Sequence, residues 1–186
     1  MLSDFQVISI KNFYKATFLD QIRINRCIER NYKSHPPTSN TYNFHLKFDD
    51  TTFFSKLYNE FLVSCTQIFG NFTCVSGNND PLWSNRNKAI PWCYRSHRKD
   101  CTCIWHNHLY TSTINGVYYY QVEGDGIFFE RNGKEFHYIP QQGELIIFPN
   151  DLNHNAARTT SQNWRYSINM EILTEESSST LFKKYK

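Results

Sequence analysis

The sequence predicts a mainly β domain, a sandwich or barrel, supported by α-helices in its N-terminal part. Its 186 residues fit one domain. Aromatic residues, which favour strands, make up 17% of the chain. Beyond residue 100, about seven short strand-like stretches separated by turn residues follow closely on one another, as in sandwiches and barrels. We therefore expect a single domain over 1–186, with a support region at 1–75, a loop or lid at 76–100, a strand-rich core at 101–172 and a tail at 173–186.

The support region combines strand-like and helix-like patterns. Residues 5–10 and 42–48 alternate apolar with polar side chains, as half-buried strands do. Residues 16–32 carry a one-sided apolar pattern, and a second helix is expected from near 50–52 to Phe69, with Gly70 as its stop. The apolar positions expected to face the core are Leu19, Ile22, Cys27 and Ile28 in the first helix, and Phe54, Leu57, Phe61, Cys65 and Ile68 in the second.

The core contains the strand signals and their turns. Asn132-Gly133 is a type I′ pair that joins two strands in a hairpin. Before the core, residues 76–100 are polar and turn-prone, which predicts a long ordered loop. After it, residues 175–179 are expected to fray. The strand-like stretches are 104–108, 112–122, 127–130, 135–139, 145–148, 154–157 and 164–172.

Charge and composition exclude several classes. The net charge of +3 comes from scattered basic residues, so nucleic acid is not indicated as a partner. We find no apolar run of membrane-spanning or signal length, and therefore expect no membrane partner and a cytoplasmic location. Without a secretory signal, the six cysteines are expected to be free thiols.

Three histidines in the core have the spacing of a metal site. His106 and His108 are two residues apart, so in a strand both imidazoles lie on one side. His154 follows an apolar stretch that ends at Pro149, where a turn could bring the chain back beside the first pair. Imidazole is a common ligand of transition metals. The three side chains are therefore candidate ligands of one ion.

An arginine follows the third histidine at short range. Arg165 lies at the centre of an apolar strand-like stretch, eleven residues after His154. A buried, unpaired charge is costly, so this position calls for an anion. The planar guanidinium suits a carboxylate, and Ser167, on the same strand face, adds a hydroxyl donor.

This combination resembles the Fe(II)- and 2-oxoglutarate-dependent oxygenases, whose core is a double-stranded β-helix, or jelly roll. The local amino-acid sequence is similar to that of a branch of small 2-oxoglutarate oxygenases found in bacteria and in T4-like phages of cyanobacteria. The resemblance covers roughly residues 90–172. The segments that carry it are Trp105-His106-Asn107-His108, 112–120, 143–149 with His154, and Arg165-x-Ser167.

The resemblance implies a role for each matching residue. His106 and His154 would bind Fe(II), Arg165 would pair with the distal carboxylate of 2-oxoglutarate, and Ser167 would assist it. The departure is His108, because the superfamily usually has a carboxylate there. Three neutral imidazoles leave the Fe(II) site at +2 instead of +1. The nearest acids that could replace His108 are Glu123 and Asp125.

Further site residues are proposed by position. Tyr118 or Tyr120 would offer a hydroxyl to 2-oxoglutarate, with strand packing as the competing interpretation for both. The loop at 76–100 is the candidate lid, and the aromatic residues assigned to the substrate surface are Trp92, Tyr94 and Trp105, with Trp83 as a further candidate.

The implied activity is oxidative decarboxylation of 2-oxoglutarate by O₂, coupled to hydroxylation of a substrate C–H bond. The substrate and the oligomeric state are left open, and a phage-encoded enzyme would act in the host cytoplasm. Three alternatives also stay open. They are a zinc module using Cys93, Cys101 and Cys103 with the histidine pair, a cupin-type three-histidine metalloprotein such as a thiol dioxygenase, and a non-catalytic jelly-roll protein.

Overall fold

The structure, a computed structural model, describes residues 2–22, 24–26, 53–75, 92–96, 104–122, 126–157 and 165–185. Helical residues occur at 18–22 and 24–26, between the first strand and the long helix. Among the described helices, none has the length and hydrophobicity needed to cross a bilayer. The other elements are η1 (Leu2–Phe5), β1 (Ile8–Ile10), α2 (Phe53–Phe69), β2 (Trp92–Ser96), β3 (Ile114–Gln121), β4 (Ile127–Arg131), β5 (Lys134–Tyr138), β6 (Leu145–Pro149), β7 (Asn153–Ala156), β8 (Arg165–Ile172), α4 (Ser178–Leu181) and η3 (Lys183–Tyr185).

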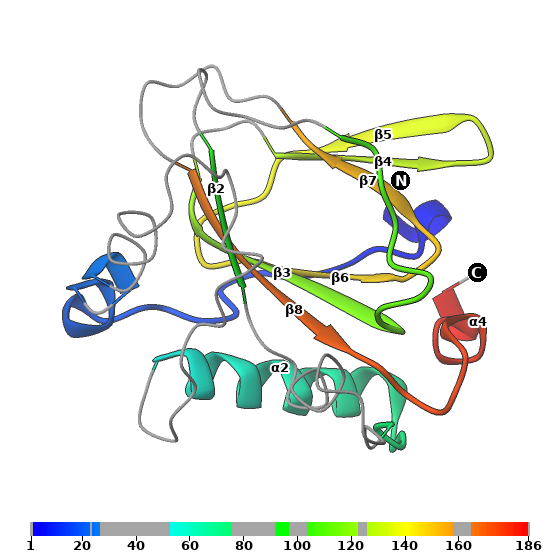
Figure 1. Cartoon of the computed structure of the whole chain (residues 1–186), viewed down its shortest axis with the longest axis horizontal. Coiled ribbons are helices and arrows are strands. Elements are labelled where there is room, and N and C mark those ends of the chain that lie inside the picture. Colours follow the sequence, from blue (N-terminus) through cyan, green and yellow to red (C-terminus); the bar gives the residue numbers. More distant parts are fainter. Residues whose placement is uncertain are drawn as a thin grey trace.

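The strands form two antiparallel sheets that face each other (Figure 1). The larger sheet has five strands in the order β1-β6-β3-β8-β2, and the smaller has three in the order β5-β4-β7. Consecutive strands β6 and β7 lie in different sheets, so the chain crosses from one layer to the other between them. The mainly β prediction is confirmed, and the two sheets enclose the interior of the domain.

Helix α2 covers the outer face of the larger sheet (Figure 1). Of its predicted apolar stripe, Phe54, Leu57, Phe61 and Cys65 are buried, and Ile68 is half-buried against the same cluster. The contact with β3 is so close that a Cβ atom on Gly116 would lie 2.5 Å from Cε2 of Phe61. Glycine is therefore required at this position by the approach of the helix.

A second apolar cluster fills the space between the sheets. It combines inner-face residues of β3 and β6 with residues of β4 in the smaller sheet. Phe129 and Phe148 meet there edge to face, with ring centroids 5.4 Å apart. The fold thus has two apolar layers, one on each face of the larger sheet.

The predicted hairpin and its turn are confirmed. β4 and β5 pair from Ile127↔Tyr138 to Arg131↔Lys134. The two turn residues, Asn132 and Gly133, have φ values of 55° and 74°, the positive angles that a type I′ turn requires.

Several local expectations were wrong. Leu19 is 63% exposed, and the fully buried residue of this helical stretch is Ile24, which packs in the α2 cluster. Residues 92–96, within the expected loop, form β2 and pair with β8. The tail does not fray near Ser177, because the Ser177 side chain accepts a hydrogen bond from the backbone N–H of Thr180 and caps α4. The predicted strand at 42–48 lies outside the described residues, and so do the predicted core positions Cys27 and Ile28.

Candidate metal centre

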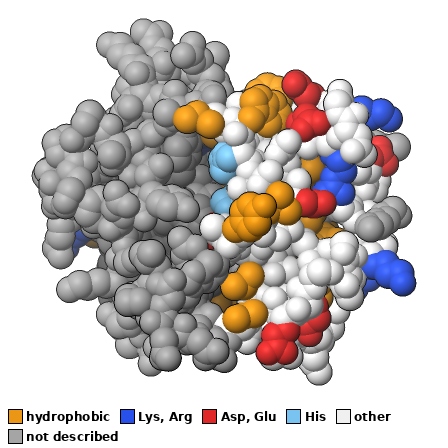
Figure 2. All heavy atoms as spheres, turned by 45° about the vertical axis from the view of Figure 1, so that its right-hand side comes forward, with side chains coloured by type: hydrophobic (Ala, Val, Ile, Leu, Met, Phe, Trp, Pro, Cys, Tyr) orange, Lys and Arg blue, Asp and Glu red, His pale blue; other side chains and the backbone are white. Residues whose placement is uncertain are grey.

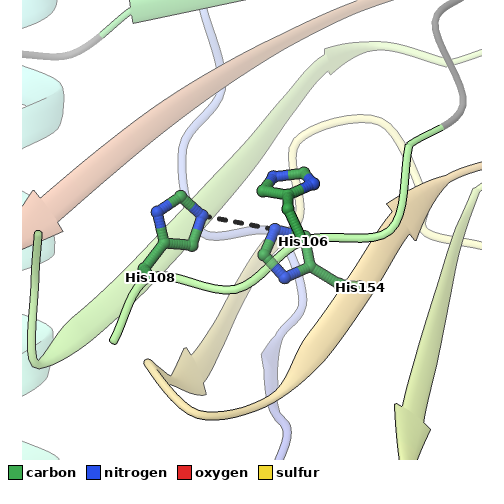
Figure 3. A group of neighbouring side chains, drawn as sticks. All are labelled: His106, His108 and His154. Carbon is green, nitrogen blue, oxygen red and sulfur yellow. Dashed lines mark hydrogen bonds between the residues drawn. The ribbon is translucent and has the colours of Figure 1, made fainter. Parts of the chain in front are cut away.

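The three predicted histidines meet at one point between the two sheets (Figure 3). His106 and His154 are joined by a single antiparallel bridge with backbone N–H···O distances of 3.1 and 2.9 Å. The expected strand at 104–108 is reduced to this bridge. His108 is held separately, since its backbone N–H donates to the carbonyl of Asn150 at 2.8 Å. One donor atom from each histidine lies within 4.8 Å of the others.

The ring nitrogens that point away from the cluster have acceptors. Nδ1 of His106 lies 2.9 Å from the carbonyl of Ile104, and Nδ1 of His154 lies 3.1 Å from the carbonyl of Leu152. A carbonyl oxygen can only accept, so both Nδ1 atoms carry the proton and both Nε2 atoms present lone pairs.

The third ring completes a convergent set. Nε2 of His108 lies 3.3 Å from Nε2 of His154. Two nitrogens bound at about 2.1 Å to one ion, at angles of ~90–110°, are about 3.0–3.4 Å apart. Without a metal, an N–H on one of these nitrogens donates to the lone pair of the other, and a bound cation would take the place of that proton. The donor set therefore fits a transition metal.

Two of these rings favour the neutral form, the buried His154 and, although its residue is exposed, His106. Burial lowers the pKa of His154 well below 6.5, and the neighbouring His106 and His108 lower it further. Burial also lowers the pKa of His106, with its hydrogen bond to the Ile104 carbonyl acting in the opposite direction. Neutral imidazole is the form that binds a metal, so the site is ready for an ion near pH 7.

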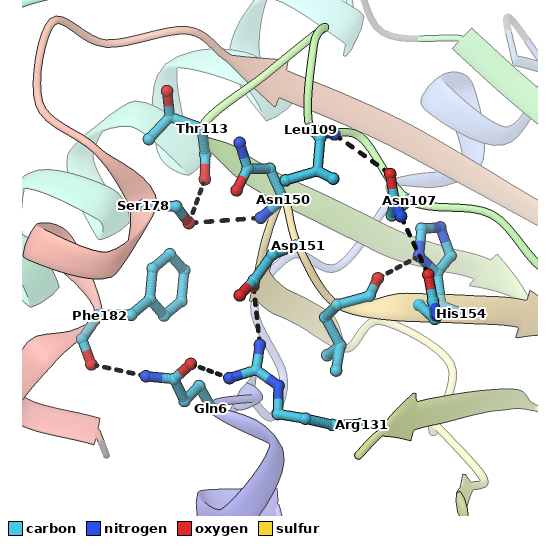
Figure 4. A network of polar contacts seen from close by, with 12 residues as sticks. Gln6, Asn107, Leu109, Thr113, Arg131, Asn150, Asp151, His154, Ser178 and Phe182 are labelled. Atoms are coloured by element: carbon cyan, nitrogen blue, oxygen red, sulfur yellow. Dashed lines mark hydrogen bonds and ion pairs between the residues drawn. The ribbon is translucent and has the colours of Figure 1, made fainter. Parts of the chain in front are cut away.

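The turn that carries His154 is fixed by both ends of the chain (Figure 4). The Asn150 side chain donates to the carbonyl of Ser112 at 2.8 Å, and its backbone N–H donates to Ser178 Oγ at 3.3 Å. Asp151 pairs with Arg131 at 2.8 Å, and Arg131 also donates to Gln6. These contacts hold the β6–β7 turn in place.

Arg165 lies between the sheets, as the anchor prediction requires. It is 2% exposed, and its Nη1 donates to the carbonyl of Gly126, next to β4, at 3.0 Å. It makes no ion pair with any described residue. Its one hydrogen bond within the described ranges uses a single N–H of the guanidinium, so the group has further donors for an anion.

Ser167 lies on the inner face of the larger sheet, whereas the two predicted tyrosines, Tyr118 and Tyr120, lie on its outer face. Ser167 is 5% exposed and shares the alternation of Arg165 along β8. Tyr118 and Tyr120 lie in the apolar cluster under α2, and the Tyr118 hydroxyl donates to the carbonyl of Tyr14 at 3.0 Å. This places the ring of Tyr118 on the opposite face of the sheet from Arg165, the packing position that was the competing interpretation. Tyr119, opposite Ser167 in register and buried in the cluster between the sheets, is the tyrosine on the inner face.

The predicted substrate residues lie at different places. Trp105 is 42% exposed beside His106, and Figure 2 shows hydrophobic side chains next to histidines on this surface. Trp92 and Tyr94 lie on β2, opposite Asn169 and Ser167 of β8. Trp83, Glu123, Asp125, Cys101 and Cys103 lie outside the described residues.

Glu171 was missed by the sequence interpretation. Its Oε1 lies 2.9 Å from Nδ1 of His108. The available signal was the alternation along β8, since 165, 167, 169 and 171 share one face of the strand.

Comparison with known proteins supports the fold. No protein-family model and no curated protein sequence matches this chain. Among solved structures, a prolyl 4-hydroxylase from Phytophthora capsici is similar over 94% of this chain, with a TM-score of 0.65 and 13% identity, and this chain covers 60% of that structure. HygX from Streptomyces hygroscopicus, solved with nickel and 2-oxoglutarate bound, has a TM-score of 0.58 and 10% identity over 95% of this chain and 86% of its own. A Pseudomonas putida prolyl-4-hydroxylase has a TM-score of 0.52 and 12% identity, covering 95% of this chain and all (100%) of its own.

The fold is that of the 2-oxoglutarate–Fe(II) oxygenases. The predicted double-stranded β-helix with supporting helices is thus confirmed, and so is the resemblance at the level of the fold. Sequence identities of 10–13% say nothing about substrate. The function has to be argued from the site of this chain.

Proposed function

We propose that this protein is an Fe(II)- and 2-oxoglutarate-dependent oxygenase that hydroxylates a C–H bond of its substrate. The observation that carries the proposal is the pairing of two features around one interior cluster. In the apolar cluster between the sheets, the ring of Phe148 contacts His154, with centroids 4.8 Å apart. Tyr119 of the same cluster is close enough to Arg165 for the positive charge to act on its hydroxyl. A metal site and an anion site beside one apolar interior are the two requirements of a carboxylate-chelating oxygenase.

His106, His108 and His154 would hold the iron through Nε2. Imidazole ligands suit iron, and bound iron supplies the O₂ chemistry. The protein contributes ligand orientation, through the carbonyls of Ile104 and Leu152 that fix two of the rings.

Arg165 would bind the distal carboxylate of 2-oxoglutarate, with Ser167 adding a hydroxyl donor. The guanidinium is buried and directed into the interior, so it would gain a counter-charge when the dianion binds. Phe129 and Phe148, which are 0% and 1% exposed, would exclude water from this interior.

Anaerobic titration tests the proposal. Protein loaded with Fe(II) under argon should develop a metal-to-ligand charge-transfer absorption band when 2-oxoglutarate is added, and succinate should form when O₂ is admitted with a substrate. Absence of the band in protein that has bound one Fe(II) per chain would contradict the proposal.

A cupin-type three-histidine dioxygenase is the second candidate. The absence of a carboxylate from the metal-binding group among the described residues favours it. Such an enzyme would bind Fe(II) in the same titration but give no charge-transfer band with 2-oxoglutarate. A zinc module would instead bind Zn²⁺ with loss of titratable thiols, and a non-catalytic jelly roll would bind neither metal.

A further inference from the structure

Glu171 is a half-buried acid directly behind one of the three histidines. Its side chain is 15% exposed, and Oε1 is closed off from solvent. That oxygen lies 2.9 Å from Nδ1 of His108, although the ring N–H is not aligned with it as a hydrogen bond. Thr111 Oγ1 lies 3.3 Å from the same nitrogen. Among the described residues, Oε1 accepts no other hydrogen bond, so His108 is its principal polar contact.

The position of Glu171 separates it from the other charged group on this strand face. Arg165 and Glu171 are six residues apart on β8, which is about 20 Å along an extended strand. The two charges therefore do not neutralise each other. Each faces a different part of the interior, the arginine near Gly126 and the acid at His108.

Glu171 is also on the wrong side of the ring to be a ligand. The approach of His108 to His154 is made through Nε2, whereas Glu171 lies at Nδ1. The described metal-binding group contains three histidines and no acid. An acid in this place acts on the metal through the imidazole.

The other two histidines are held differently. Their Nδ1 atoms face neutral backbone carbonyls, those of Ile104 and Leu152. Only His108, among these three, has a carboxylate at this position. His108 is also the residue that stands where the related oxygenases usually have an acid.

We propose that Glu171 is a positioning residue that replaces the missing ligand carboxylate from behind His108. It favours the Nδ1–H tautomer, directs the Nε2 lone pair at the metal, and returns one negative charge to a site that three neutral imidazoles would leave at +2. A carboxylate behind a ligating histidine raises the donor strength of the ring. This inference rests on the proposed metal-binding function, and it concerns residues of this chain alone.

Metal affinity measured with Co(II) tests the charge. Competition with a chromophoric chelator gives the dissociation constant for the wild type and for Glu171→Gln. The glutamine keeps the size and can accept from Nδ1 through its amide oxygen, but it lacks the charge. We expect about 10–100-fold weaker Co(II) binding, the range typical of lost outer-shell partners. Glu135→Gln on β5, an exposed site with the same charge change, is the matched control and should leave Co(II) affinity unchanged.

Repeating Glu171→Gln in a His108→Asp protein tests whether the effect on metal affinity passes through the His108 ring. His108→Asp moves a carboxylate into the ligand set, so Glu171→Gln should no longer weaken Co(II) binding there and could strengthen it by removing a nearby like charge. Circular dichroism identifies any variant that fails to fold. If His108→Asp alone does not fold because Glu171 has lost its partner, the double variant His108→Asp/Glu171→Gln, which lacks that acid, is compared with the wild type instead. The Co(II) absorption spectrum should change with Glu171→Gln in the wild-type background only.

The outcomes distinguish this inference from the proposed function. A wild type that binds no Co(II) or Fe(II) overturns both. A wild type that binds metal, with equal affinities for Glu171→Gln and Glu135→Gln, overturns only the role of Glu171. An equal loss in the wild-type and His108→Asp backgrounds also overturns it, because the effect would then not pass through the histidine. Weaker binding confined to the wild-type background supports it.

Discussion

The two faces of strand β8 have opposite chemistry. Ile168, Met170 and Ile172 lie in the apolar cluster under α2. The alternate positions carry Arg165, Ser167, Asn169 and Glu171. The outer face thus packs a helix, whereas the inner face places a buried cation near one end and a half-buried acid near the other.

The same division runs through β3. Tyr118 and Tyr120 join the cluster under α2, whereas Val117 and Tyr119 join the cluster between the sheets. Both layers are buried, so burial alone does not identify the functional face. Within the described part of the chain, the inner face is distinguished by charged groups with few polar contacts: the guanidinium of Arg165, which donates to the Gly126 carbonyl, and Oε1 of Glu171, which lies against His108. The comparison can be tested by substitutions on each face.

The largest effect is expected from His154→Ala. This change removes one of three ligands and should weaken Co(II) or Fe(II) binding by more than about 100-fold, beyond the range of an outer-shell partner. Chelator competition measures it. His137→Ala on β5 removes an exposed imidazole that stacks on Phe128, and should bind metal like the wild type. Comparable losses in both variants would mean that the three-histidine site is not where the metal binds.

Phe61→Ala tests the outer face. Truncation of this fully buried ring beside Gly116 should lower the free energy of unfolding by about 3–5 kcal/mol, through lost burial and a cavity. Urea unfolding of the metal-free protein measures it. Val63→Ala, on the same helix but 51% exposed, should change it little. Co(II) affinity of the folded protein should be unchanged in both; a large loss for Phe61→Ala would contradict the separation of the two faces.

Arg165→Ala tests the anion site on the inner face. Loss of a buried partner of a carboxylate should weaken 2-oxoglutarate binding by about 2–5 kcal/mol, which is ~30-fold or more in Kd. Titration of the Fe(II)-loaded protein, followed by the charge-transfer band, gives the constant. Arg165→Lys should retain part of the affinity because it keeps the charge but not the planar fork. Lys134→Ala, an exposed site on β5, is the control. Unchanged Kd in Arg165→Ala would remove the anchor from the proposal.

Glu144→Gln sharpens the contrast between two acids, the buried Glu144 and the half-buried Glu171. Unlike Glu171, Glu144 is saturated: it accepts from Ser9 and Lys11 at 2.6 Å, from the backbone of Gln141 at 2.7 Å, and from Tyr138. Burial raises its pKa, but these hydrogen bonds outweigh burial and lower the pKa below 4.5. We expect a loss of about 1.5–3 kcal/mol of unfolding free energy at pH 7, with no change in Co(II) affinity.

The pH dependence of that loss follows from the direction of the shift. The unfolded chain binds the proton of Glu144 more readily than the folded protein, so the stabilisation is complete well above pH 4.5 and is lost as the pH falls through the lowered pKa. Urea unfolding between pH 7 and pH 3 should therefore show the wild type and Glu144→Gln converging at low pH. A constant difference would mean that the carboxylate charge does not contribute, and Glu135→Gln should parallel the wild type throughout.

The sequence indicated most of the metal site because its signals are local. His106 and His108 are two residues apart, and His154 follows a strand that ends in a proline turn. The Asn132-Gly133 hairpin was likewise readable, since a type I′ turn is specified by its own residues. Strand β2 was not, because its pairing depends on β8, some 70 residues away in sequence.

Which face of a strand is functional was decided by packing. Tyr118 and Tyr119 have the same chemistry and adjacent positions, and only the docking of α2 assigns the first to the outer cluster and the second to the interior. Leu19, which was expected to face the core, is exposed and Ile24 is buried for the same reason, since propensity and periodicity do not specify which side of a short helix meets the sheet. The sequence by itself determined the β-rich class, the three histidines and the arginine, because composition and spacing along one strand carry that information. The approach of Glu171 to His108 was decided by tertiary structure alone, because 63 residues separate them and only the pairing of β3 with β8 brings that end of β8 beside the metal centre.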